Sequence, residues 1–206
     1  MGEASHISLS TRHHAVERTA LKEWAVLARA MGRGEIIAMV RKGGIREQRS
    51  GFSVRHDRFV LYPTYFHEKA AELQPRFAAA LDEAAAERPA PGVIRVELVA
   101  SVEAVWRVGS LAPLREIEGE HGLAWSAVES RFHYRDRPGV QVIAVRTARL
   151  AHPVEPPEIR RYGGCVSWVE LDSDIDVAGA GPVVDEPSFT ARLARLRGVL
   201  GDPEVD

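Results

Sequence analysis

The sequence predicts an α+β protein in which a mixed sheet of five or six strands is packed by helices. Apolar runs of strand length occupy residues 36–40 and 59–62, and residues 94–100 alternate between apolar and charged side chains, as in a half-buried strand. Apolar residues recur at helical spacing over residues 15–31. With 206 residues, 45% of them hydrophobic, the chain is long enough to bury a sizeable core in one domain.

The first half of the chain is divided by glycines and prolines. The helix expected over residues 15–31 is stopped by the glycines that follow it. The two apolar strands come next, joined by a long polar loop, and Pro63 ends the second of them. Residues 65–87 are then expected to be helical, and Pro75 either kinks this helix or begins a second one.

In the second half, a strand beginning at residue 94 is expected to run on towards residue 108, short helices occupy 110–130, and a long strand covers 140–150. The composition changes after Leu171, where an acidic stretch rich in glycine and proline begins. Phe189, Leu193 and Leu196 then indicate one amphipathic helix. We therefore expect one α+β domain over residues 13–171, followed by an acidic linker and a C-terminal helix over 172–206.

Composition also restricts the class of protein. The single cysteine, Cys165, excludes an internal disulfide, and its apolar neighbours predict that it is buried. The N-terminus lacks the apolar segment of a signal peptide, and no apolar run approaches the roughly 20 residues of a membrane span. These observations predict a cytoplasmic protein without a membrane partner.

The loop between the first two strands is strongly basic. Residues 41–58 contain six lysines and arginines but only two carboxylates, Glu47 and Asp57, in a chain of net charge −2. Such a local excess of positive charge predicts an anionic partner. Two glycines at the start of the loop allow another molecule to approach the backbone closely.

These features predict a ligand site between the glycine turn and the segment that follows the second strand. Cations at the turn would hold phosphate together with backbone amides, tyrosines would stack on a base, and a histidine would donate or accept a hydrogen bond. The candidate residues for binding nucleic acid or a nucleotide-like ligand are Lys42, Gly43, Gly44, Arg46, Tyr62, Thr64, Tyr65 and His67.

Common catalytic and metal-binding motifs are missing from the sequence. It contains neither G-x-x-x-x-G-K-[ST] nor G-x-G-x-x-G nor G-x-S-x-G, and its histidines do not have the usual spacing of zinc ligands. We therefore expect no cofactor. One alternative is a phosphodiester hydrolase that uses Glu47 and Asp57 with magnesium. Another is a protein-interaction module whose C-terminal helix docks on a partner.

Several phrases of the sequence resemble one bacterial family of domains of unknown function, family 1802. The resemblance covers roughly residues 20–171 and implies no established activity or catalytic residue. The phrases are Leu21-Lys-Glu-Trp, Arg41-Lys-Gly-Gly-Ile-Arg-Glu, Leu61-Tyr-Pro-Thr with His67, Arg131-Phe, and Tyr162-Gly-Gly-Cys-Val-Ser-Trp-Val-Glu-Leu.

Two further segments are similar to the PUA-like group, which includes the EVE and ASCH domains. Asp57-Arg-Phe-Val-Leu-Tyr resembles a strand of those domains, and Val145-Arg-Thr-Ala-Arg-Leu-Ala-His-Pro-Val-Glu-Pro-Pro-Glu-Ile resembles their closing strand and short helix. This resemblance implies a barrel-like, PUA-like sheet. It also implies binding of RNA or modified bases.

Overall fold

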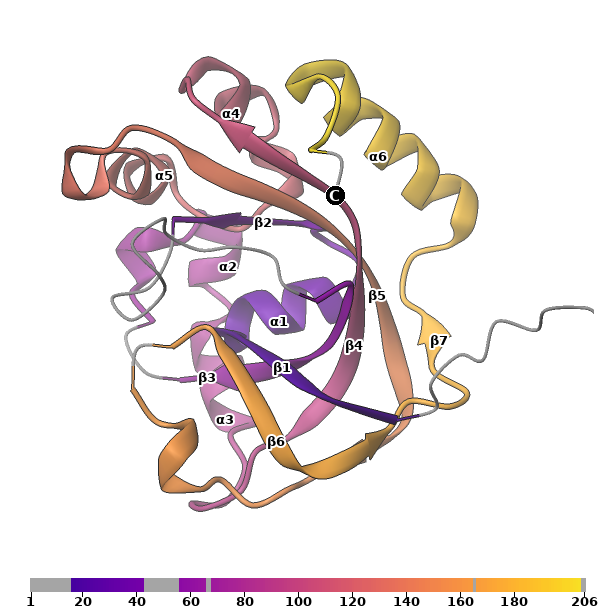
Figure 1. Ribbon diagram of the computed structural model, residues 1–206. Coiled ribbons are helices and arrows are strands. Elements are labelled where there is room, and N and C mark those ends of the chain that lie inside the picture. The colour runs from indigo at the N-terminus through magenta and orange to yellow at the C-terminus, as the bar shows by residue number, and fades with distance from the viewer. Residues whose placement is uncertain (1–15, 43–55, 66–67, 165, 205–206) are drawn as a thin grey trace, which may run out of the picture.

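The computed structural model describes residues 16–42, 56–65, 68–164 and 166–204, and it confirms the α+β class (Figure 1). Seven strands form one mixed sheet with the order β2-β5-β4-β3-β1-β6, and β7 pairs with β5. Only β1 and β3 pair in parallel; the other pairs are antiparallel. Within the described ranges β2 and β6 do not pair with each other, so the curved sheet stays open.

The elements alternate between strands and short helices along the chain. The strands are β1 (Val16–Trp24), β2 (Ala38–Arg41), β3 (Arg58–Thr64), β4 (Val96–Val108), β5 (Val140–Val154), β6 (Trp168–Asp176) and β7 (Gly181–Pro182). The α-helices are α1 (Ala25–Gly32), α2 (Pro75–Ala78), α3 (Leu81–Ala86), α4 (Ala112–Glu116), α5 (Trp125–Phe132) and α6 (Glu186–Leu200). Single 3-10 turns lie at Ala70–Glu72, Glu118–Glu120, Tyr134–Asp136 and Arg160–Tyr162.

The helix expected over residues 15–31 is wrong in its first half. Residues 16–24 form β1, which lies between β3 and β6, and helix begins only at Ala25. Ala20 and Leu21 are both fully buried because the strand is covered on both faces. Hydrogen bonding to two neighbouring strands overrides the helical spacing of the apolar side chains.

The long helix expected over residues 65–87 is also wrong. Its described part divides into one 3-10 turn and the two short helices α2 and α3. Pro75 occupies the first turn of α2, where its missing N–H costs no hydrogen bond, so it begins a second helix. The expected strand beginning at residue 94 is confirmed as β4 and does run to Val108.

The sheet packs on both faces. Neighbouring residues such as Ala20 and Leu21, or Val60 and Leu61, belong to two different clusters of buried side chains. This follows from the alternation of side chains along a strand. The larger cluster contains residues of α1, α5 and α6, and the smaller one contains residues of β6 and the turn at Tyr162.

The C-terminal part of the chain packs against the larger cluster. Residues 172–176, expected to open a linker, lie in β6, where Ile175 is fully buried. In α6, Phe189 and Leu196 are almost completely buried. Trp106 Nε1 also donates to the oxygen of Gly201 at 2.9 Å. Whether residues 172–206 are separable from the rest stays a prediction.

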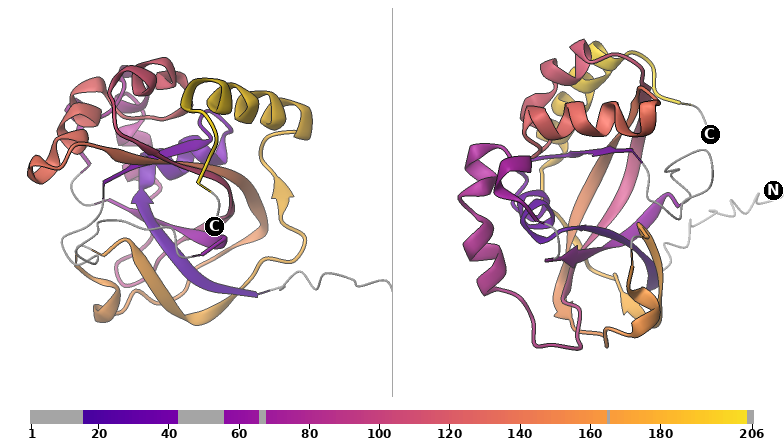
Figure 2. Two further views of the ribbon diagram at one scale, coloured as in Figure 1. Left: turned by 45° about the horizontal axis from the view of Figure 1, so that its top comes forward. Right: turned by 90° about the vertical axis from the view of Figure 1, so that its left-hand side faces the viewer.

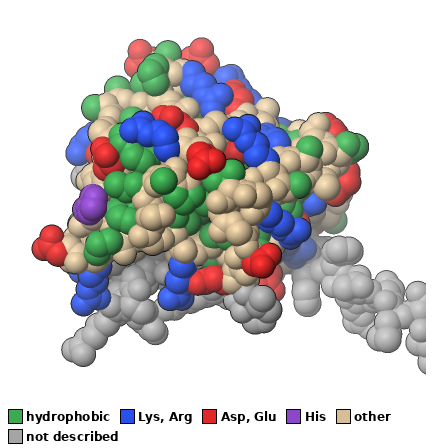
Figure 3. All heavy atoms as spheres, turned by 90° about the horizontal axis from the view of Figure 1, so that it is seen from above, with side chains coloured by type: hydrophobic (Ala, Val, Ile, Leu, Met, Phe, Trp, Pro, Cys, Tyr) green, Lys and Arg blue, Asp and Glu red, His purple; other side chains and the backbone are tan. Residues whose placement is uncertain are grey.

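Helices α4, α5 and α6 lie together at one end of the molecule, whereas α2 and α3 lie along a side (Figures 1 and 2). Seen from above, that end carries lysine and arginine interspersed with carboxylates and apolar side chains (Figure 3). Its charge is therefore mixed in sign. No helix within the described ranges is long and apolar enough to cross a membrane.

Candidate functional site

The ends of three strands, β1, β2 and β3, lie close together, although β2 is not a neighbour of the other two in the sheet. The parallel register places Lys22 beside Tyr62 and Trp24 beside Thr64, so β1 and β3 finish side by side. Strand β2 ends at Arg41, whose Nη2 donates to the backbone oxygen of Lys22 at 2.6 Å. Side chains from three distant parts of the sequence meet here.

A cavity of about 460 Å³ opens where these strands end, and we call it the strand-end cavity. Residues of the segment 88–95, Glu158, residues 162–164, and Val166 with Ser167 complete its wall. Five cations and two carboxylates line it among the described residues. They are Lys22, Arg41, Arg88, Arg95 and Arg131, against Glu23 and Glu158.

One buried carboxylate in this cavity pairs with a guanidinium group and acts on the pKa of a second. The Glu23 side chain is only 8% exposed and lies 3.0 Å from Nη2 of Arg41. Arg131 comes from the end of α5 and donates from Nη1 to the oxygen of Val40 at 2.8 Å. Burial lowers the pKa of Arg131, the carboxylate of Glu23 raises it, and the charge of Arg41 lowers it again. The carboxylate of Glu72 raises the pKa of Arg131 further.

A second polar group lies on the opposite wall. The ammonium of Lys22 donates to the backbone oxygens of Tyr162 and Gly164, and it lies 5.5 Å from the ring centre of Tyr62. Tyr62 donates from its hydroxyl to Glu158 at 2.6 Å. Burial, followed by this hydrogen bond, raises the pKa of Tyr62 well above its usual value. Tyr62 therefore stays neutral.

Two aromatic rings line the cavity together with cations. The guanidinium of Arg131 lies 5.4 Å from the ring centre of Trp24, and that of Arg88 lies 5.4 Å from the ring centre of Tyr65. Both rings are half-buried. Burial, and then the carboxylate of Glu68, raises the pKa of Tyr65. A flat ligand group could contact either ring.

The described candidates from the sequence fall at different places. Tyr62, Thr64 and Tyr65 line the strand-end cavity, but the Tyr62 ring is only 4% exposed. Thr64 donates from Oγ1 to the oxygen of Glu23 at 3.2 Å. Lys42 points elsewhere: its ammonium donates to the oxygens of Phe132 at 3.0 Å and Gly139 at 2.5 Å, and to Arg137.

Other expected residues lie outside the described ranges. They are Gly43, Gly44, Arg46, Glu47, His67 and Cys165. Asp57 is described: it is exposed, and its backbone oxygen accepts a hydrogen bond from the Val102 amide at 2.7 Å. The described residues contain no group of three His, Cys, Asp or Glu that could hold a metal ion.

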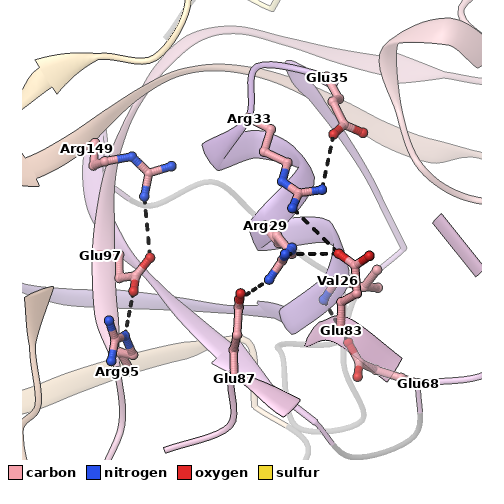
Figure 4. Close-up of polar contacts among 10 residues, drawn as sticks. All are labelled: Val26, Arg29, Arg33, Glu35, Glu68, Glu83, Glu87, Arg95, Glu97 and Arg149. Carbon is pink, nitrogen blue, oxygen red and sulfur yellow. Dashed lines mark hydrogen bonds and ion pairs between the residues drawn. The ribbon is translucent and has the colours of Figure 1, made fainter. Parts of the chain in front are cut away.

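A second cavity of about 400 Å³ lies between α1, α3 and β4, and we call it the helix cavity. It shares Pro63, Tyr65 and Arg95 with the strand-end cavity. The four arginines that line it are all ion-paired with glutamates, as the close-up of Figure 4 shows. The pairs are Arg29 with Glu83 and Glu87, Arg33 with Glu35 and Glu83, Arg95 with Glu97 and Glu155, and Arg149 with Glu97.

The sequence did not identify Lys22, Glu23, Trp24 or Arg131 as site residues. A signal was present, because these residues belong to the phrases that resemble a known family. In the structure, phrases separated by more than a hundred residues meet at one cavity. The phrases that contribute residues to the strand-end cavity are those that begin at Leu21, Arg41, Leu61, Arg131 and Tyr162.

The chain belongs to the family DUF1802, a domain of unknown function, whose sequence pattern matches residues 20–195. No curated protein matches the chain in sequence.

Among solved structures, the ASCH protein from Zymomonas mobilis matches 85% of this chain and 92% of its own, at 15% identity and a TM-score of 0.41. A tyrosine-to-phenylalanine mutant of that protein matches at 13% identity over 75% of this chain and 90% of its own. A serine-to-alanine mutant matches at 14% identity over 88% and 98%. Both mutants have a TM-score of 0.42.

These neighbours carry the ASCH name that the sequence resemblance had indicated.

Proposed function

We propose that the strand-end cavity binds a phosphate-bearing ligand, either nucleic acid or a nucleotide-like molecule. The observation that carries this proposal is the excess of cations in its lining: four besides Arg95, which is ion-paired with Glu97 and Glu155, against two carboxylates. Arg41 pairs with the buried Glu23, and Arg131 is a buried guanidinium without an ion pair among the described residues, so the lining would attract an anion that enters the cavity.

The cations have different roles under this proposal. Arg88 is exposed at the rim beside the ring of Tyr65, so it would contact phosphate from the entrance. Arg41 and Arg131 lie deeper and would hold an anion through charge-assisted hydrogen bonds. Lys42 keeps its ammonium on three backbone oxygens, which supports a structural role for it. Under this proposal Arg41, the last residue of β2, replaces Lys42 as the cation that contacts the ligand.

The test is equilibrium binding of single-stranded RNA, single-stranded DNA and duplex DNA, measured by fluorescence anisotropy across a range of salt concentrations. Arg88→Ala should weaken binding and reduce the slope of log K against log salt by about one. The matched control is Arg107→Ala, because Arg107 is 75% exposed and pairs with Glu204 away from both cavities. Equal effects of the two variants, or no binding by the wild type, would overturn the proposal.

A further inference from the structure

The two cavities adjoin at Tyr65, and their linings differ in a way that fits the two halves of a nucleotide. We propose that the helix cavity is a nucleobase pocket, which takes the base of a nucleotide whose phosphate lies in the strand-end cavity. This inference rests on the proposed function. It adds a second site and the chemical class of group that the site receives.

The floor of the helix cavity is apolar and closely packed. Small or aliphatic side chains form it, namely those of Ala25, Ala28, Leu61, Ala84 and Leu98. Ala28 and Ala84 line the cavity and are each only 3% exposed, so they belong to its packed inner wall. A flat heterocycle gains by leaving water for such a surface, whereas a phosphate would lose its hydration without compensation.

The rim of the same cavity is polar but nearly balanced in charge. Glu97 accepts from Arg95 Nε at 2.5 Å and from Arg149 Nη1 at 3.4 Å. Arg149 is held further by a 2.5 Å hydrogen bond from Nη2 to the oxygen of Gly32. Arg29 is paired with Glu83 and Glu87 on and beside α3 (Figure 4).

Such a rim suits a neutral group with its own donors and acceptors. Carboxylates accept from the amino and imino groups of a base, and guanidinium groups donate to its ring nitrogens and carbonyl oxygens. A guanidinium plane can also stack on a base. Because the arginines are already paired with carboxylates, the rim has little net attraction for a phosphate.

The junction between the cavities is suitable for the sugar. Pro63, Tyr65 and Arg95 line both cavities, so a ligand passing from one to the other runs along these three side chains. The ring of Tyr65 is half-buried and lies beside the guanidinium of Arg88. Volumes of about 400 and 460 Å³ leave room for a base on one side and phosphate on the other.

The test compares ligands that differ only in the base. Adenosine 5′-monophosphate, uridine 5′-monophosphate and ribose 5-phosphate would each be titrated into the full chain by calorimetry. We expect at least one of the two nucleotides to bind about tenfold more tightly than ribose 5-phosphate, as one stacked base contributes. Equal affinity of all three for the wild type would overturn the nucleobase pocket.

Ala84→Leu should fill the pocket and remove the tenfold gain, while the affinity for ribose 5-phosphate stays unchanged. Ala85→Leu is the matched control, because Ala85 is the next residue of α3, is exposed and does not line the cavity. It should keep the gain. A folded Ala84→Leu protein that keeps the full nucleotide advantage would contradict the assignment.

Glu97→Gln is a second variant, which keeps the shape of the side chain if Ala84→Leu fails to fold. It should change the ratio of the two nucleotide affinities without changing the affinity for ribose 5-phosphate. An unchanged ratio would count against the pocket. If ribose 5-phosphate binds but the base adds nothing, only this inference fails; if none of the phosphate ligands binds, the proposed function fails with it.

Discussion

The strand-end cavity and the helix cavity lie on either side of Tyr65 and contain similar numbers of arginines, but the arginines of the two cavities differ in their ion-pair partners. Every arginine lining the helix cavity has a glutamate within 4.0 Å. In the strand-end cavity Arg41 pairs with the buried Glu23 and Arg95 with Glu97 and Glu155, whereas no ion pair of Arg131 is found among the described residues. Under the two proposals, ion pairing of the arginines, and not their number, distinguishes the cavity that takes an anion from the cavity that takes a neutral group.

The carboxylates of the two cavities also differ in how far they are buried. The carboxylates of the helix cavity are accessible to water: the side chains of Glu83 and Glu87 are 62% and 63% exposed. Exposed pairs of this kind contribute little to the free energy of folding. Glu23 in the strand-end cavity is 8% exposed, so its charge depends on Arg41 for compensation.

The largest effect is expected from removing the C-terminal segment that supports the larger core cluster. Deletion of residues 177–206 should unfold the protein or expose its core, because Phe189, Leu193 and Leu196 are buried there. Circular dichroism and thermal unfolding would measure this loss of structure and stability. A folded truncated protein with an unchanged melting temperature would show that residues 172–206 are separable, as the composition alone predicts.

The next largest effect should come from the buried carboxylate. Glu23→Gln removes the buried carboxylate that pairs with Arg41 and should lower the free energy of unfolding by about 3 kcal/mol. Added phosphate should restore part of this loss. Glu97→Gln, in the helix cavity, is the control and should change stability by less than about 0.5 kcal/mol. Equal losses of unfolding free energy in the two variants, measured by chemical denaturation, would contradict the proposed difference between the cavities.

The charge of the strand-end cavity also bears on His121. Burial first, and then the charge of Arg131, lowers the pKa of His121 to about 4. In the unfolded chain this group binds its proton near pH 6.5. Stability should therefore be fully present above pH 6.5 and fall as the pH drops towards 4, by at most about 3 kcal/mol.

An NMR titration of the His121 ring would measure this pKa directly. If the strand-end cavity takes an anion, phosphate should raise the pKa of His121, because it offsets the charge of Arg131. A His121 that titrates near pH 6.5 in the folded protein would refute the expected pH dependence.

A smaller effect is expected at Lys42, whose ammonium holds the turn between α5 and β5. Lys42→Ala should cost about 1–2 kcal/mol, since three backbone oxygens lose their donor. Binding of single-stranded RNA should change less than it does in Arg88→Ala. Weakened binding with unchanged thermal stability would return Lys42 to the ligand site, as the sequence alone predicted.

The sequence predicts the α+β class and the strands with clear alternation or compact apolar runs. It fails at β1, because Val16, Ala20 and Trp24 also have helical spacing. Pairing with β3 and β6 decides that segment, and such long-range pairing leaves no local pattern. The acidic segment 172–176 was misleading for a similar reason, since Leu171 before it and Ile175 within it are buried in β6.

The candidate site was predicted in part. Tyr62, Thr64 and Tyr65 do line the strand-end cavity, because the end of an apolar strand is visible in the sequence. The contribution of Arg131 could not be predicted from local pattern, since α5 reaches the cavity only through the packing of the fold. The ion pair of Glu23 with Arg41 likewise joins two strands that are not adjacent in the sheet.

The most direct measurement of the central claim is the position of a bound oxyanion. Crystals of the full chain soaked in tungstate, an electron-dense analogue of phosphate, would give an anomalous peak at each site that binds it. The account predicts a peak in the strand-end cavity between Arg41 and Arg131, and none among the paired arginines of the helix cavity. A peak at Arg29, Arg33 or Arg149 with an empty strand-end cavity would contradict it.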